Sequence, residues 1–154
     1  MRQIQLRDPN FSLDSFMRLA HEYLIPEILD AILTGDLAAL RVWCSEGTFN
    51  LLKASLEAQL KSGCRLDGRV LDLRHIDLAT ARLIEETPIV VLSFTTQQIS
   101  VMREIATGKV VEGAEDKIDT VMYVMALARE ETVSNPITKG WRLAEIAIRE
   151  GGGL

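Results

Sequence analysis

The sequence predicts an α+β fold in which N-terminal helices pack on one face of a curved antiparallel meander sheet. Two observations lead to this class. Apolar residues recur at three- and four-residue steps through the first 60 or so positions, and from Arg69 onward they alternate as in strands. The strand candidates are separated by short turn sequences such as "EETP" and "ATGK", which favour antiparallel neighbours. Helices followed by a run of strands are typical of α+β domains.

The first helical segment begins near residue 12 and continues to about residue 33. Ser12 or Asp14 is the expected N-cap, and Pro26 is expected to kink the helix or divide it in two. Gly35 suits a left-handed helix end, and Asp36 suits the next N-cap. A short helix is then expected over residues 37–44, a turn over residues 45–48, and a longer helix over residues 49–61.

Four long strands are expected after the helices. The first begins at Arg69, and its alternation slips around His75–Asp77, which predicts a β-bulge that bends the strand. The others are expected near residues 89–103, 118–129 and 141–149. The segment from Pro88 to Glu130 is apolar on both faces at its centre. We expect the helices to cover one face of these strands and leave the other open for a pocket or a partner.

Composition narrows the possible functions. The 154 residues carry a net charge of −5 with a pI near 5.1, which argues against a nucleic-acid partner. No apolar run reaches the roughly 18–20 residues that a membrane-spanning helix needs. Cys44 and Cys64 lack CxxC spacing and are expected to be reduced, and neither the histidines nor the carboxylates have metal-ligand spacing. We therefore expect no metal and no cofactor.

One enzymatic hypothesis follows from the expected fold. Helices wrapped by a curved sheet form a cone, and such cones can hold a carboxylate and a tyrosine in an isomerase or small-molecule pocket. Asp72 and Tyr123 are the candidate pocket residues, with His75 nearby. The alternative interpretation places Asp72 on the solvent face, Tyr123 in the core and His75 at a bend. This interpretation is favoured because a single sequence does not show the three side chains converging.

The N-terminal helix is more apolar than packing on one sheet face requires. A helix of this kind packs on two sides or lies on a membrane or a partner protein. If part of this face stays free, a large exposed apolar patch is expected there. The candidate membrane- or partner-binding residues are Phe11, Leu13, Phe16, Met17, Arg18, Leu24 and Ile25.

Four segments in order carry a family resemblance. They are "IPEILDAILTGDLAALRVWCSEGTFNLL", "GRVLDLRHIDLATARLI", "GKVVEGAEDKIDTVMYVMALARE" and "GWRLAEIAI". Together they resemble the C-terminal domain of the family of subunit 44 of the mitochondrial inner-membrane import translocase. The resemblance runs from about Phe11 to Ile148 and implies a cystatin-like or nuclear transport factor 2-like cone.

The resemblance implies a non-enzymatic docking role. Such a domain would attach the protein-import motor to the presequence translocase, as a peripheral protein on the matrix face of the mitochondrial inner membrane. Its implied partners are the channel subunits and anionic lipid, notably cardiolipin, bound through the N-terminal helices. The motor chaperone would be contacted only by regions outside the matching segment. The expected organisation is an arm or truncated helix at residues 1–10, one domain at 11–149 and a flexible tail at 150–154.

Overall fold

A computed structural model of the chain describes residues 12–130 and 135–149. Its helical part contains α2 (Leu13–Leu19), a π-helical turn η1 (Ala20–Leu24), α3 (Ile25–Thr34), α4 (Leu37–Trp43) and α5 (Glu46–Lys61). Seven strands follow: β1 (Cys64–Leu66), β2 (Arg69–Ile84), β3 (Thr87–Ile99), β4 (Met102–Glu104), β5 (Val110–Glu112), β6 (Asp119–Arg129) and β7 (Trp141–Ile148). The predicted arm at residues 1–10, Phe11 and the predicted tail lie outside the described residues.

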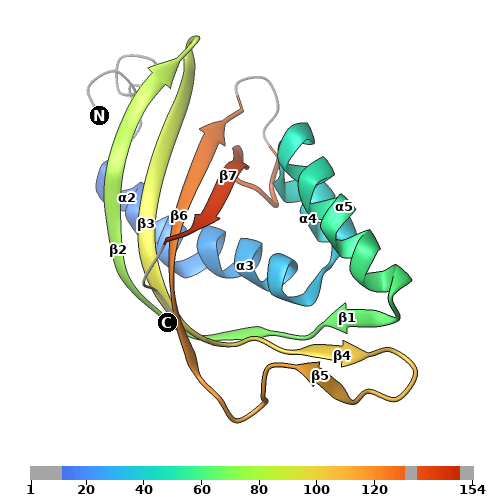
Figure 1. Cartoon of the computed structure of the whole chain (residues 1–154). Coiled ribbons are helices and arrows are strands. Elements are labelled where there is room, and N and C mark those ends of the chain that lie inside the picture. Colours follow the sequence, from blue (N-terminus) through green and yellow to red (C-terminus); the bar gives the residue numbers. More distant parts are fainter. Residues whose placement is uncertain (1–11, 131–134, 150–154) are drawn as a thin grey trace.

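The strands form two antiparallel sheets. The larger has the order β2-β3-β6-β7, and the smaller has the order β1-β4-β5. Figure 1 shows α3 lying in the angle between the two sheets, with α4 and α5 across the open side. The predicted α+β class with helices on a curved meander is confirmed. The smaller sheet was not predicted, because its three-residue strands are too short to leave an alternation pattern.

Local signals in the sequence set most of the helix ends. The Ser12 side chain accepts a hydrogen bond from Ser15 N–H, and the Asp36 carboxylate accepts one from Ala39 N–H at 3.1 Å. Gly35 takes the left-handed conformation at φ +66°, as predicted. The predicted turn at residues 45–48 is wrong. Ser45 is instead the N-cap residue of α5, which therefore begins at Glu46, three residues before the predicted start at Phe49.

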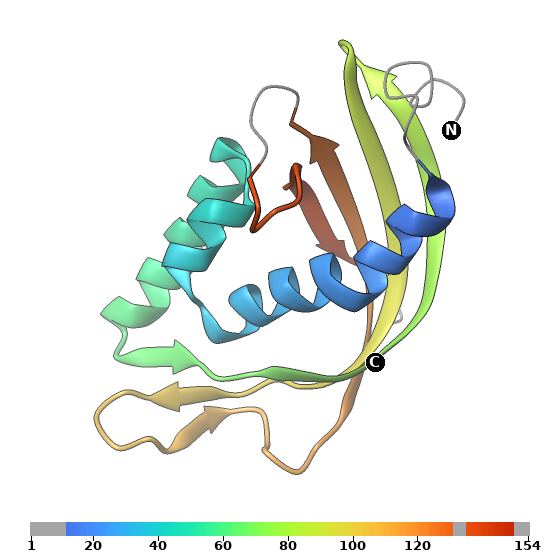
Figure 2. The same cartoon turned by 180° about the vertical axis from the view of Figure 1, so that it is seen from behind.

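Pro26 divides the first helical segment, as predicted, and the break takes the form of the π-helical turn η1. Pro26 lies in the first turn of α3, where its missing N–H is tolerated. A π-helical turn before it lets the chain change direction while keeping helical hydrogen bonds. Figure 2 shows the result as a bent rod of α2 and α3 crossing the concave side of the large sheet.

The strand β2 contains the predicted bulge. Its register against β3 shifts between Arg74 and Asp77, and His75 takes φ +56°. The predicted strand over residues 89–103 is divided: β3 ends at Ile99, and β4 begins at Met102 in the other sheet. Residues 100 and 101 therefore mark the corner at which the chain passes between sheets.

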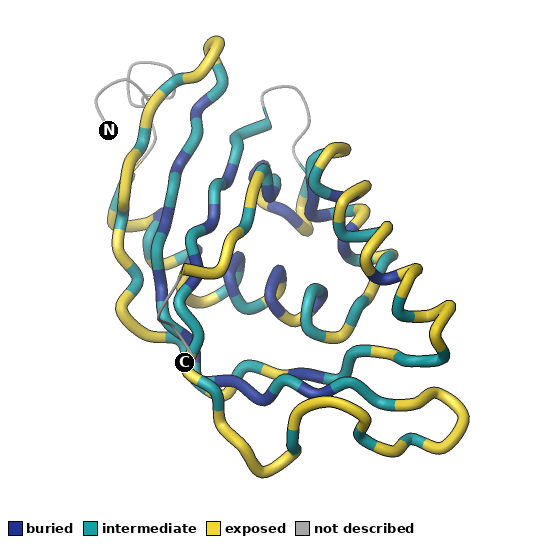
Figure 3. The backbone as a smooth tube through the Cα atoms, in the orientation of Figure 1, coloured by how far each residue is buried: buried dark blue, intermediate teal, exposed yellow. Residues whose placement is uncertain are grey.

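The core lies between the bent helical rod and the inner face of the large sheet. Alternate residues of β3, from Pro88 to Gln98, are buried against the helices, and those between them are only half buried. Figure 3 shows buried positions along α3 and β3. The described helices lie on this inner face, so the outer face of β3 and β6 is open in the described part of the chain. The expected division into one covered and one open face is therefore correct.

Candidate functional site

The first candidate site is the bent helical rod, which side-chain contacts hold against the rest of the molecule. The Phe16 ring packs on Trp141 with centroids 4.7 Å apart, and the Tyr23 ring packs near Trp43 at 5.8 Å. The Tyr23 hydroxyl donates a hydrogen bond to the Ile137 carbonyl at 2.5 Å. Aromatic contacts of this kind add to the free energy gained from burial. The rod is therefore fixed between the sheet and the 135–141 segment.

These contacts bury much of the apolar surface that the sequence suggested could be free. Phe16, Leu24 and Ile25 belong to the hydrophobic core. In the conformation described, these three side chains are not available to a membrane or a partner. The physical reason is that the rod packs on two sides, against the sheet and against the α4 region.

The remaining predicted residues keep some access to solvent. Leu13 and Met17 are half buried, and Arg18 is exposed on the same helix. Phe11 lies outside the described residues. A binding role for these positions stays a prediction, and within the described chain it can rest only on Leu13, Met17 and Arg18.

The large exposed apolar side chains of the described residues lie away from α2. They are on α5, along the edge and turn of β2, around the hairpin of β4 and β5 (called the β4–β5 arm below), and near β7. The expected large apolar patch on the N-terminal helix is therefore not displayed by its described residues. The set comprises Leu51, Leu60, Leu71, Ile84, Ile105, Val111, Ile118, Ile137 and Ile148.

The second candidate site, around Tyr123, is a buried polar network. The Tyr123 hydroxyl donates to Gln98 Oε1 at 2.9 Å, and the Thr96 hydroxyl donates to the same oxygen at 2.6 Å. Gln98 Nε2 donates to the Ser100 hydroxyl at 2.8 Å. Burial raises the pKa of Tyr123, with the Gln98 hydrogen bond opposing that rise. The groups satisfy one another, which makes this a structural network in the core.

The alternative hypothesis, a pocket that pairs Asp72 with Tyr123, does not match the strand register. Asp72 is paired in register with Gln97, and Tyr123 with Phe94, so the two side chains project from opposite faces of the sheet. Asp72 forms an ion pair with Arg74 beside it, and the hydrogen bond from Arg74 is the main reason that the pKa of the Asp72 carboxyl lies below its ordinary value. His75 is exposed at the bulge. The structure therefore supports the non-catalytic interpretation of these three residues.

A small cavity of about 120 Å³ lies between α3 and the β4–β5 arm, lined mainly by apolar groups that include Leu33, Leu66 and Met102. Pockets for drug-sized ligands usually start near 300 Å³. Other hollows are larger, at about 310–470 Å³. One of about 330 Å³, between the helical rod and β2, is lined in part by His21, Asp30 and Asp72.

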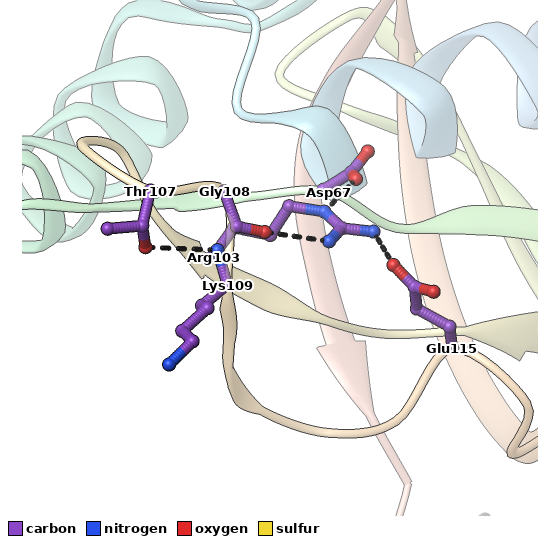
Figure 4. A network of polar contacts seen from close by, with 6 residues as sticks. All are labelled: Asp67, Arg103, Thr107, Gly108, Lys109 and Glu115. Atoms are coloured by element: carbon purple, nitrogen blue, oxygen red, sulfur yellow. Dashed lines mark hydrogen bonds and ion pairs between the residues drawn. The ribbon is translucent and has the colours of Figure 1, made fainter.

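A third polar cluster, shown in Figure 4, ties the small sheet to the large one. Arg103 on β4 donates to Asp67 at 2.5 Å and to the Gly108 carbonyl at 2.9 Å, and it forms an ion pair with Glu115. The hydrogen bond from Arg103 is the main reason that the pKa of Asp67 lies below its ordinary value. One guanidinium thus joins β4 to the turns before β2 and β6. The cluster therefore fixes the position of the β4–β5 arm. No local sequence pattern predicts this cluster, because its residues are up to 48 positions apart in the chain.

Comparison with known proteins shows the family to which the chain belongs. A family model described as the Tim44-like domain matches residues 1–148. The chain belongs to the Tim44-like family. It is 35% identical over 152 residues to the mitochondrial import inner membrane translocase subunit TIM44 of Saccharomyces cerevisiae, covering 97% of this chain and 35% of that protein. The Homo sapiens subunit of the same name is 34% identical over 140 residues, covering 91% of this chain and 30% of that protein.

The Tim44-like domain described here spans about a third of the length of these curated relatives. A solved structure, the intermembrane space region of the chloroplast protein ARC6, has a similar fold, with a TM-score of 0.56. The alignment covers 91% of this chain and 98% of that one at 10% identity, so the likeness concerns the fold alone. In the described part of the Tim44-like chain, no helix has the length and apolar content needed to cross a membrane.

Proposed function

We propose that this chain is a docking domain that attaches the protein-import motor to the presequence translocase at the matrix face of the mitochondrial inner membrane. The observation that carries this proposal is the 35% identity to an inner-membrane import translocase subunit over 97% of the chain. The location follows the same relatives, whose names place them in the inner-membrane translocase of yeast and human mitochondria.

The domain would act by binding, without catalysis. The polar groups around Tyr123 are occupied by one another, and Asp72 projects from the opposite sheet face. Among the described residues, no cluster of three or more histidine, cysteine, aspartate or glutamate side chains could hold a metal ion. The channel subunits of the translocase are the proposed protein partners. Contact with the motor chaperone is assigned to the parts of the relatives that this chain does not span.

For the membrane partner, we infer that the exposed part of α2 contacts anionic lipid such as cardiolipin. Leu13 offers apolar surface and Arg18 offers a positive charge one turn and a half further along the helix. A cation near an anionic surface contributes about 1 kcal/mol to binding. Because Phe16, Leu24 and Ile25 are buried, this contact is expected to be shallow.

Liposome flotation tests the membrane proposal. The chain should float with vesicles that contain cardiolipin and remain at the bottom with neutral phosphatidylcholine vesicles. The double variant Leu13→Glu/Arg18→Glu should bind about tenfold more weakly, since it removes apolar contact and reverses a charge. The matched control is Leu60→Glu/Lys61→Glu, which changes net charge equally on exposed positions of α5. An equal loss of vesicle binding in both double variants, or flotation that does not depend on lipid charge, would show that α2 is not the lipid contact.

The translocase proposal has a separate test. Immobilised domain should retain channel subunits from detergent-solubilised inner membranes of its own organism, identified by mass spectrometry. Added soluble domain should compete for them. If the folded domain retains no channel subunit while floating normally, docking to the translocase is wrong and membrane binding alone remains.

A further inference from the structure

The large sheet ends in two edge strands, β2 and β7, which differ in how they are protected. Edge strands present unpaired backbone groups to any other strand, and proteins block them with bulges and charged side chains. The β2 edge has both: its register against β3 shifts at three places, and Asp72, Arg74, Asp77 and Arg82 lie along it. In contrast, β7 has the sequence WRLAEIAI and ends at Ile148 without a bulge in its second half.

The first half of β7 is covered by the rest of the chain. Ser45 N–H donates to the Leu143 carbonyl at 3.0 Å, and the Thr48 hydroxyl donates to the Ala144 carbonyl at 2.6 Å. Beyond Ala144 no such contact is recorded in the described part of the chain. In the strand order β2-β3-β6-β7 this strand is an edge strand, and Figure 1 shows it beside β6.

The direction of the free backbone groups follows from the pairing with β6. Arg149 N–H donates to the Met122 carbonyl at 2.7 Å, so the Arg149–Met122 pair is hydrogen-bonded. Hydrogen-bonded and non-hydrogen-bonded pairs alternate along an antiparallel ladder. Ala147 and Glu145 therefore also bond to β6, whereas the N–H and C=O groups of Ile146 and Ile148 point away from it.

We propose that a second copy of this chain pairs with β7 edge to edge, in an antiparallel, two-fold symmetric register centred on Ala147. In that register Ile146 of each copy faces Ile148 of the other. Each of these two pairs exchanges two backbone hydrogen bonds, because these are the residues whose backbone groups point outward. The contact is isologous, so both copies use the same surface and the assembly closes as a dimer.

The side chains fit the same register. Glu145 faces Arg149 of the second copy on the outer face of the sheet, which gives two opposite-charge pairs across the two-fold axis. On the inner face Ile148, which is 66% exposed in the single chain, packs against Ile146 of the second copy. If the register shifted by one residue, Ile146 and Ile148 would lie opposite residues whose backbone groups already bond to β6. The hydrogen bonds between the two copies would then be lost.

A groove beside this edge gives the partner strand further contact. It has a volume of about 470 Å³, lies between α5 and β7, and is lined by residues that include Leu51, Leu52 and Ile146. Leu51 is 77% exposed, although it is a large apolar side chain. Side chains from the inner face of a second β7 would enter the open side of this groove. The charge match and the apolar groove both favour a second copy over an unrelated strand.

Analytical ultracentrifugation at about 100 µM protein tests the proposal, since a small interface of this kind is expected to have a micromolar dissociation constant. The chain should sediment as a concentration-dependent dimer. Glu145→Arg and Arg149→Glu should each weaken the dimer by about tenfold or more, because each replaces two opposite-charge pairs with two like-charge pairs. The double variant Glu145→Arg/Arg149→Glu should restore the dimer.

An edge variant and a control complete the test. Ile148→Asp should give a monomer, and Ile118→Asp, at an exposed isoleucine 56% accessible before β6, should leave the dimer unchanged. Circular dichroism confirms that each variant is folded. A monomer at all concentrations would overturn the proposal, and so would a dimer whose affinity ignores the charge reversals or is not rescued by the double variant.

Discussion

Cys44 lies at the end of α4, where the chain turns toward β7. Its side chain belongs to the core, and its carbonyl accepts a hydrogen bond from Arg142 at 3.2 Å. Burial raises the pKa of the Cys44 thiol to about 11, and the positive charge of Arg142 opposes that rise only in part. The thiol is therefore inert at neutral pH, whereas Cys64 is only partly buried. Both cysteines are free thiols in the structure.

The raised pKa of Cys44 predicts a loss of stability in alkaline solution. Between the ordinary value of 9.0 and about 11, the unfolded chain releases the thiol proton while the folded chain keeps it. The free energy of unfolding should therefore be unaffected below pH 9 and fall above it, by roughly 1–3 kcal/mol in total. Denaturant unfolding at several pH values measures this slope. Cys44→Ala should show a shallower slope over the same window, and identical slopes in the two proteins would contradict the assignment.

Gly113, between β5 and β6, occupies a position where the backbone accommodates only glycine. Its φ is +79°, and a Cβ placed on it would lie 2.1 Å from the Ser100 carbonyl oxygen. Gly113→Ala should lower the free energy of unfolding by more than about 2 kcal/mol, through strain and a clash with backbone. Gly108→Ala is the control, because Gly108 also has positive φ but open space around it. It should lose only about 1 kcal/mol. Similar losses in both variants would show that the corner at Ser100 adapts.

At the scale of elements, the bulge in β2 is a local distortion that the sequence pattern predicted. The alternation of Leu71 and Leu73 slips at His75, and the structure has a register shift and a positive φ at that residue. Because His75 is exposed, its side chain is expected to contribute little to packing, and its conformational strain should dominate the effect of a substitution.

A pair of substitutions measures that strain. His75→Val should destabilise the protein by about 1–2 kcal/mol, because a β-branched side chain is poorly accommodated at positive φ. His75→Gly should be neutral or slightly stabilising, since glycine adopts this conformation freely. Thermal or denaturant unfolding distinguishes the two. If valine is tolerated as well as glycine, the bulge is not held at this φ in solution.

Other elements could not be predicted because tertiary contacts decide them. The small β1-β4-β5 sheet depends on Arg103 joining Asp67, Gly108 and Glu115, which no local pattern reveals. The start of α5 at Glu46 was missed because Ser45, Gly47 and Thr48 read as a turn in isolation. The excess of apolar residues in α2 and α3 was recognised, but the sequence left two causes open, packing on two sides or contact with a membrane or partner. The aromatic contacts to Trp43 and Trp141 show that the rod packs on two sides.

At the scale of the whole molecule, the pocket hypothesis and the family prediction have different outcomes. The sequence could name Asp72 and Tyr123 but not the face from which each projects, since that depends on the register across β2, β3 and β6. The family, in contrast, was predictable from ordered segments spread over nearly the whole chain, and the match over residues 1–148 confirms it. The family can be recognised from segments spread over the whole sequence. A pocket depends instead on the strand register and on the directions of a few side chains, which the sequence does not give.

The whole-molecule account assigns three surfaces to three tasks. The exposed part of α2 would face the membrane, the second half of β7 would pair with a second copy, and the outer face of β3 and β6 remains open for a protein partner. The outer positions Val91, Val124 and Ala126 on these central strands are half buried and apolar, so this face suits a protein contact. The Arg103 cluster holds β4 to the turns before β2 and β6.

Site-specific photo-cross-linking on inner-membrane vesicles tests the proposed docking to the presequence translocase. A photoreactive residue would replace Val124 on the outer sheet face in one protein and Leu60 on α5 in another. We expect adducts with channel subunits of the translocase from position 124 and few or none from position 60. Both proteins should still associate with the vesicles. Folded, vesicle-associated protein that yields no translocase adduct from position 124, or equal adducts from both positions, would contradict the account.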